Sequence, residues 1–154
     1  MPKDFVEISK EITFEAAHYL HNPAWSRIKN IEVFGKCSGF RRDDPKAEGY
    51  PHGHSYRLRV TVKGPVQKET GFVVDFRKLK EILAEEVEQR YDHRFLNKEV
   101  EPFKSNPAKQ PTAENIVVDF WKRLVPRLKQ EKVIPVEMTL WESEASFVTY
   151  RGGK

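Results

Sequence analysis

The chain contains a single cysteine, Cys37, so an internal disulfide is excluded. A chain without disulfides is typical of the reducing cytoplasm, where we expect this protein to function. Long apolar runs are lacking too, because no stretch approaches the ~18 residues of a membrane-spanning helix. The first seven residues, MPKDFVE, contain acids where a secretory signal has its apolar core, so we do not expect secretion.

The sequence also lacks a strong excess of one charge. Its 27 basic and 23 acidic residues are interspersed without a dense cluster, although the net charge of +4 gives a pI near 9.1. An even mixture favours a solvated surface over a nucleic-acid interface, which needs clustered cations. A mildly basic protein also suits a phosphorylated small substrate. The length and the 38% hydrophobic content predict one domain over residues 1–154, with no repeats or low-complexity segments.

Four segments have the alternating pattern of half-buried strands. Apolar residues alternate over residues 6–18, and His18 falls on the inward-facing parity. A second strand is predicted over 52–62, a third over 136–142 and a short fourth over 146–151.

Two segments have helical spacing of apolar residues. Asp75 is the predicted N-cap of a helix that runs to about Arg90, and Thr112 is the predicted N-cap of another. The order β-β-α-α-β-β predicts an α+β fold, in which two helices cover one face of a four-stranded antiparallel sheet. The open edges of such a sheet need protection, so we expect subunit pairing and a homo-oligomer.

Residues 21–51 contain prolines, glycines and charges without a periodic pattern, and we expect an enlarged irregular loop there. A loop of this length in a compact domain is usually functional or mobile.

His52-Gly53-His54 is the most informative motif of the chain. Residues two apart in a strand point to the same side, so both imidazoles face one way. His18 ends another strand on its inward face. The alternative is three unrelated histidines, but their combination favours a metal site. Three histidines with an open fourth position are typical of catalytic zinc.

Two acidic positions are further candidates. Asp92 can orient the adjacent His93 and raise its basicity, which makes a proton-transfer group near neutral pH. The alternative is a solvated helix end, where a histidine suits the helix dipole. Glu142 continues an apolar parity, so it is either an inward carboxylate that pairs with a ligand or a strand end in solvent.

Cys37 and Glu48 are the candidates in the loop before the histidine motif. A lone cysteine is usually a small buried apolar residue, but Lys36, Arg41 and Arg42 would favour a thiolate here. Glu48 stands four residues before His52 and is either an ordinary loop glutamate or a base.

Taken together, these motifs resemble the 6-pyruvoyltetrahydropterin synthase family, which includes the 6-carboxy-tetrahydropterin synthase of queuosine biosynthesis. The resemblance spans residues 10–152. The matching segments are Phe14-Glu15-Ala16-Ala17-His18, His52-Gly53-His54-Ser55-Tyr56, Gly71-Phe72-Val73-Val74-Asp75-Phe76, Asp92-His93-Arg94-Phe95-Leu96-Asn97, Pro111-Thr112-Ala113-Glu114-Asn115, and Glu142 with Tyr150-Arg151-Gly152.

The resemblance implies a tunnelling fold (T-fold), in which subunits join their sheets into a barrel, commonly in hexamers. It also implies that His18, His52 and His54 hold Zn2+.

For the substrate, the resemblance implies that Glu142 anchors the amino-pyrimidine edge of a pterin, with Thr112 and Glu114 near the same pocket. It implies that Asp92 and His93 belong to the proton-transfer apparatus.

One spacing departs from the family. The carboxy-tetrahydropterin branch has three residues between the catalytic cysteine and His-Gly-His, and the pyruvoyl branch has five. Here the fourteen residues Ser38 through Pro51 separate Cys37 from His52. Either an insertion lengthens the loop while Cys37 still reaches the zinc, or Glu48 replaces the thiol, as in a glutamate-using branch. The segment Lys36-Cys37-Ser38-Gly39 resembles the family's lysine-cysteine junction and favours the insertion.

The expected activity is that of a zinc-dependent lyase that converts 7,8-dihydroneopterin triphosphate to 6-carboxy-5,6,7,8-tetrahydropterin. The alternative products are 6-pyruvoyltetrahydropterin and, with Glu48 as base, 6-hydroxymethyl-dihydropterin. Charge alone makes Arg41 and Arg42 candidates for phosphate contacts. A pterin-binding module without catalysis is the non-enzyme alternative, and a nucleic-acid binder is suggested only by the pI.

Overall fold

The computed structural model describes residues 4–41, 43–44 and 49–153. Its elements in chain order are β1 (Phe5–His18), α1 (Arg27–Phe34), η1 (Gly35–Ser38), β2 (His52–Pro65), α2 (Phe76–Leu83), η2 (Ala84–Glu88), α3 (Gln89–Tyr91), β3 (Arg94–Phe95), α4 (Leu96–Glu99), α5 (Ala113–Gln130), β4 (Ile134–Trp141) and β5 (Phe147–Tyr150).

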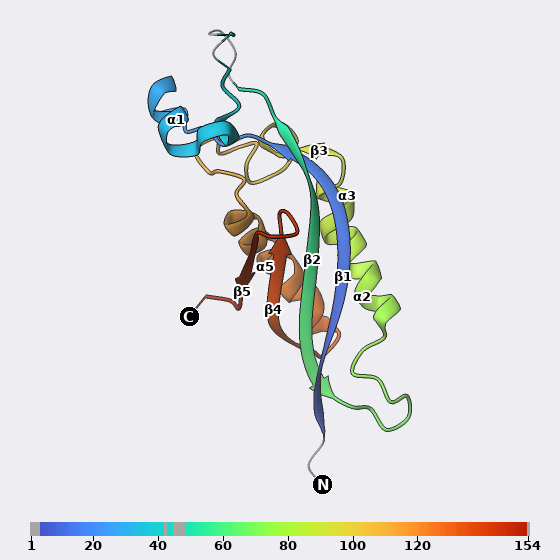
Figure 1. Ribbon diagram of the computed structural model, residues 1–154. Helices are drawn as coiled ribbons and strands as arrows, with labels where there is room; N and C mark the ends of the chain where they lie inside the picture. The colour runs from blue at the N-terminus through green and yellow to red at the C-terminus, as the bar shows by residue number, and fades with distance from the viewer. Residues whose placement is uncertain (1–3, 42, 45–48, 154) are drawn as a thin grey trace.

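The sheet has the strand order β3-β1-β2-β4-β5 and is open at both edges (Figure 1). β1 and β2 pair antiparallel along their whole length, from Phe5 opposite Pro65 to His18 opposite His52. β4 and β5 continue the antiparallel order, so the four predicted strands are present. β3 is a two-residue addition that pairs parallel to the end of β1. The sequence did not predict it because two residues carry no alternation.

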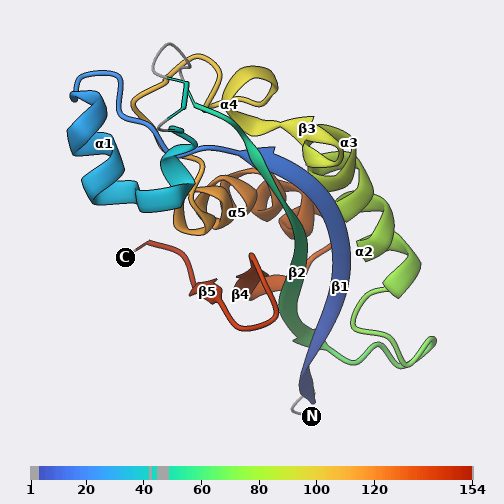
Figure 2. The ribbon, with the colours of Figure 1, turned by 45° about the horizontal axis from the view of Figure 1, so that its top comes forward.

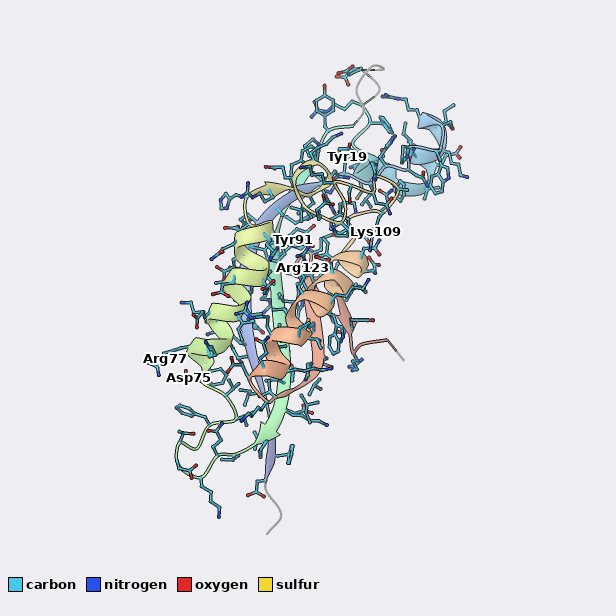
Figure 3. All side chains as sticks on the ribbon, turned by 180° about the vertical axis from the view of Figure 1, so that it is seen from behind. Tyr19, Asp75, Arg77, Tyr91, Lys109 and Arg123 are labelled. Atoms are coloured by element: carbon cyan, nitrogen blue, oxygen red, sulfur yellow. The ribbon has the colours of Figure 1, made fainter. Side chains whose placement is uncertain are left out.

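Two long helical segments cover one face of the sheet, as the view from behind shows (Figure 3). One is α5, and the other runs from α2 through the π-helical turn η2 into α3. Both predicted N-caps are present. Asp75 accepts a hydrogen bond from the amide of Arg77 at 2.8 Å, and Thr112 accepts one from the amide of Asn115 at 3.3 Å.

The core lies between these helices and the inward-facing residues of the strands. Phe14 stacks on Tyr56 with ring centroids 5.0 Å apart, and the edge of Phe120 from α5 packs against Phe14 at 5.7 Å. Aromatic packing at these distances adds to the area that the rings bury. This packing holds β1 and β2 against α5, close to the ends of the two strands where the histidines lie.

Residues 21–51 are more ordered than expected, because they contain α1 and η1. Ser26 caps α1 by accepting a hydrogen bond from the amide of Lys29. The buried side chain of Asn30 binds the preceding turn, donating to the carbonyl of Asn22 at 3.1 Å and accepting from its amide at 2.7 Å. The helix escaped prediction because its apolar side chains face outward, with Ile28 70% exposed.

α1 lies beyond the upper end of the sheet (Figure 1), on the side of the molecule away from α2 (Figure 2). Across the described parts of the chain, no helix has the length and apolar content needed to cross a membrane.

Candidate active site

The three predicted metal ligands lie together at the paired ends of β1 and β2. The register sets His18 directly opposite His52, and paired residues of antiparallel strands point to the same face. The Nε2 atoms of His18 and His52 are 3.0 Å apart. The ring of His54 lies 5.0 Å from that of His18 and 4.9 Å from that of His52, so one nitrogen of each ring lies within 4.8 Å of the others.

The protonation state of His18 suits a ligand. Its Nδ1 lies 2.7 Å from the carbonyl oxygen of Pro111. Because a carbonyl only accepts, Nδ1 is the protonated nitrogen, and Nε2 presents its lone pair to the other two rings. Burial lowers the pKa of His18 to about 4, although the hydrogen bond to Pro111 opposes this shift. Burial and then the neighbouring His54 also lower the pKa of His52.

The cluster fits a tetrahedral metal ion. Ligand nitrogens at ~2.0–2.1 Å from zinc are about 3.3 Å from one another in a tetrahedron, close to the 3.0 Å between the Nε2 atoms of His18 and His52. Nε2 of His54 is buried and has no hydrogen-bond partner among the described residues, which is costly unless a ligand satisfies it. Three imidazoles with this geometry are therefore a suitable Zn2+ site.

Cys37 shares a cavity with two of these histidines. The cavity has a volume of ≈ 400 Å³, and its lining residues are Lys36, Cys37, Gly39, Phe40, Arg41, Tyr50, Pro51, His52 and His54. The carbonyl of Cys37 accepts a hydrogen bond from the amide of Leu20 at 2.7 Å, which ties η1 to the chain that leaves β1. The long loop therefore does not keep the thiol away from the histidines.

The segment between Gly39 and Tyr50 is an excursion closed at its base. The amide of Tyr50 donates to the carbonyl of Gly39 at 2.9 Å, and a Cβ on Gly39 would lie only 2.2 Å from the carbonyl oxygen of Tyr50. Across this closure only four residues, Ser38, Gly39, Tyr50 and Pro51, connect Cys37 to His52. Glu48, the alternative base, and Arg42 lie outside the described residues.

Glu142 follows β4 directly and lies close to His54. Its carboxylate oxygen Oε1 is 3.8 Å from Nε2 of His54. The amide of Glu142 donates to the carbonyl of Ser146 at 3.0 Å, which fixes the turn into β5. Glu142 and Glu114 line one cavity of ≈ 380 Å³, whereas Thr112 caps α5.

Asp92 and His93 contact each other at the end of α3. Oδ2 of Asp92 lies 3.0 Å from Nδ1 of His93, and Oδ1 accepts the amide of Glu15 at 2.8 Å. The hydrogen bond from Glu15 lowers the pKa of Asp92. The amide of His93 donates to the carbonyl of Glu15 at 2.6 Å and its φ is +58°, a conformation uncommon for a residue with a side chain. The ring of His93 lines a third cavity of ≈ 460 Å³, which His54 also lines.

Tyr56 was not among the candidate site residues, although it lies two residues after His54 on the same face of β2. It is fully buried, its ring centroid is 5.6 Å from that of His54, and its hydroxyl has no hydrogen-bond partner among the described residues. Burial, and then the charge of Glu142, raise the pKa of Tyr56. Its shared parity with His52 and His54 is the sequence signal by which it could have been identified.

The site thus combines groups for three tasks. Three imidazoles can hold a metal ion, which polarises oxygen atoms of a substrate. A thiol and an imidazole paired with a carboxylate are available for proton transfer. Two carboxylates can accept hydrogen bonds from an amino-pyrimidine edge.

Comparisons with known proteins point to one family. The profile of the family described as "6-pyruvoyl tetrahydropterin synthase" matches residues 7–153. The 6-pyruvoyl tetrahydrobiopterin synthase of Drosophila melanogaster is 35% identical over 94% of this chain and 79% of its own. The 6-carboxy-5,6,7,8-tetrahydropterin synthase of Aquifex aeolicus is 30% identical over 94% of this chain and 97% of its own. The solved structure of the Caenorhabditis elegans 6-pyruvoyl tetrahydropterin synthase superimposes with a TM-score of 0.82 at 30% identity, covering 99% of this chain and 100% of that chain.

Proposed function

Because the chain belongs to the 6-pyruvoyl tetrahydropterin synthase family, we propose that it is a zinc-dependent lyase acting on 7,8-dihydroneopterin triphosphate. The observation that carries this proposal is the position of Cys37. The thiol lies in the same cavity as His52 and His54, despite the fourteen residues that separate it from His52.

In this proposal, His18, His52 and His54 would hold Zn2+, and the bound ion would supply Lewis-acid polarisation of the side-chain oxygens, which would make the adjacent C–H bonds more acidic. Cys37 as thiolate removes a proton from the side chain. His93, held by Asp92 through Nδ1, returns a proton through its other nitrogen.

Glu142 is the proposed anchor for the pterin. Its carboxylate can accept two hydrogen bonds from the ring N–H and the exocyclic amine, a charge-assisted pair that fixes the orientation of the ring. Glu114 lines the same cavity, and Thr112 holds the start of α5 beside it. The side chain of the substrate then extends toward His54, 3.8 Å from Glu142.

The names of the relatives support two products. The Drosophila and C. elegans proteins are named for a 6-pyruvoyl product, and the higher identity of the Drosophila protein favours 6-pyruvoyltetrahydropterin, formed by loss of triphosphate with the carbon skeleton retained. The Aquifex protein supports 6-carboxy-5,6,7,8-tetrahydropterin, the product expected from the sequence. The path of four residues from Cys37 to His52 lies between the spacings of the two branches and fits either.

Product analysis tests the proposal. The zinc-loaded protein is incubated with 7,8-dihydroneopterin triphosphate, and the pterins are separated and identified by mass. A 6-pyruvoyl product is expected. A 6-carboxy product would instead assign the protein to the carboxy-tetrahydropterin branch of the family. Formation of 6-hydroxymethyl-dihydropterin would favour Glu48 as the base. Binding of the substrate without its conversion would refute the lyase activity and would support the alternative, a pterin-binding protein without catalysis.

We also propose that the protein acts as a homo-oligomer in the cytoplasm. The open sheet edges at β3 and β5 support the first proposal, because exposed edges favour pairing with another strand. The single cysteine supports the second. Light scattering of the zinc-loaded protein would measure the subunit number, and a monomer would refute the oligomer.

A further inference from the structure

The cavity that Cys37 lines with His54 and the cavity lined by Glu142, whose carboxylate is 3.8 Å from His54, differ in charge. The Cys37 cavity is lined by two cations, Lys36 and Arg41, and by no carboxylate of a described residue. The Glu142 cavity is lined by two carboxylates, Glu142 and Glu114, and by no cation of a described residue.

We propose that Lys36 and Arg41 form a subsite for the polyphosphate group of the substrate. This inference rests on the proposed function and names the part of the substrate that each cavity takes. A pterin that donates hydrogen bonds belongs on the acidic side, and a polyphosphate belongs on the basic side. The side chain that joins them then passes the histidines, so the charge difference sets the direction of the substrate.

The structure holds Arg41 in place through the closed excursion. Its guanidinium lies 4.0 Å from the centroid of the Tyr50 ring, and the Tyr50 hydroxyl donates to Asp44 at 2.6 Å. The guanidinium of Arg27 donates to the backbone carbonyls of Arg41 and Asp44, which fixes the turn that carries Arg41. A guanidinium held against an aromatic face keeps its planar N–H fork available for two phosphate oxygens.

Lys36 adds a second positive charge from η1. Lys36 directly precedes Cys37 in η1, and both residues line the same cavity. The turn that positions the proposed base therefore also positions this cation. A triphosphate gains negative charge at its bridging oxygen as it leaves. Cations fixed beside it stabilise that charge without reorganisation, which assigns the pair a role in elimination as well as in binding.

Inorganic tripolyphosphate, the expected leaving group, is the direct test. We expect it to bind the zinc-loaded protein and to inhibit competitively against 7,8-dihydroneopterin triphosphate. Calorimetry should show its Kd raised about tenfold in Lys36→Gln and in Arg41→Gln, because each loses one charge-assisted contact. The zinc content is measured after each titration, since polyphosphates bind divalent cations.

Arg77→Gln is the matched control. Arg77 is 91% exposed, pairs with Asp75 at 2.7 Å and lies at the start of α2, far from Tyr19, the residue after His18 (Figure 3). It changes the net charge by the same amount and should leave the Kd for tripolyphosphate unchanged. An equal loss in Arg77→Gln would show a general charge effect and overturn the subsite.

Unphosphorylated 7,8-dihydroneopterin separates this inference from the proposed function. Its affinity should be the same in wild type and Arg41→Gln, whereas the KM for the triphosphate should rise about tenfold. Turnover with an unchanged KM in both Lys36→Gln and Arg41→Gln would refute the subsite and leave the lyase intact. A selective loss of tripolyphosphate binding in a protein without turnover would support the subsite and refute the lyase.

Discussion

Substituting Gly39 by alanine tests whether the closure of the excursion positions Cys37. Gly39 has a φ of +72°, and a left-handed conformation costs a residue with a Cβ about 1–2 kcal/mol. The new Cβ would lie 2.2 Å from the carbonyl oxygen and 2.5 Å from the nitrogen of Tyr50. These atoms belong to the backbone, so the two ends of the excursion, at Gly39 and Tyr50, must move apart.

The separation has a calculable size. Moving a contact of 2.2 Å to an ordinary distance requires a shift of about 1 Å, and a misplacement of that size at a reacting group costs about 100-fold in rate. The shift also breaks the hydrogen bond from Tyr50 to Gly39, which contributes about 0.5–1.5 kcal/mol. We expect kcat/KM for 7,8-dihydroneopterin triphosphate to fall about 100-fold, with zinc still bound because His18, His52 and His54 lie on paired strands.

Gly71→Ala is the control for this substitution. Gly71 has a φ of +73°, but a Cβ there would meet no atom within 4 Å. It therefore reproduces the conformational strain without the clash, and it lies in the loop before α2. Thermal unfolding should show a loss in both variants, and kinetic assays should show a loss of activity in Gly39→Ala alone. Full activity in Gly39→Ala would refute the view that this closure holds the catalytic thiol in place.

Three further experiments test other contacts. Cys37→Ala should lower kcat about 100-fold or more while tripolyphosphate still binds, and an unchanged rate would remove the thiol from the mechanism. Chelation of zinc should abolish turnover. In urea titrations it should also lower the free energy of unfolding by about 2.7 kcal/mol relative to the protein with zinc at 100 times its Kd. The His18→Ala variant should have the same free energy of unfolding with and without zinc. Tyr91→Phe should cost about 1.5–3 kcal/mol at pH 7 in the same titrations, because the Tyr91 hydroxyl donates to Asp119 at 2.6 Å. Above pH 10 the wild type should lose stability faster than Tyr91→Phe, and parallel losses would contradict the assignment. Burial and then Asp119 raise the pKa of Tyr91 above 10.0, so the unfolded chain releases a proton that the folded chain keeps, and stability falls as the pH rises.

The parts of the fold that sequence predicted are those with local signals. Asp75 and Thr112 cap helices because a short acceptor side chain before an apolar stripe has an immediate physical role. The parity of residues 6–18 correctly placed His18 inward, where it is 1% exposed. Alternation works here because one face of β1 packs on the helices.

The parts that sequence missed depend on contacts between distant residues. α1 is held by the buried amide of Asn30 and exposes Ile28, so a search for an apolar stripe passes over it. The contact between Asp92 and His93 was proposed from the sequence, but the positive φ of His93 and the hydrogen bond from its amide to the carbonyl of Glu15 in β1 were not predicted. No local pattern predicted the hydrogen bond from the amide of Tyr50 to the carbonyl of Gly39, which returns the chain to the histidines.

That closure shows how a long connection before His52 can still bring Cys37 to the cavity of His52 and His54. The distance from Cys37 to His52 depends on the two ends of the excursion, which are joined by the hydrogen bond between Tyr50 and Gly39. Loop length adds only a slowly growing entropic cost, so residues between these ends can vary with little effect on the thiol. The two ends of the excursion also supply Arg41 and its supporting ring, Tyr50, to the cavity. An insertion anchored in this way leaves the proposed base in place and adds a positive charge where the polyphosphate is proposed to bind.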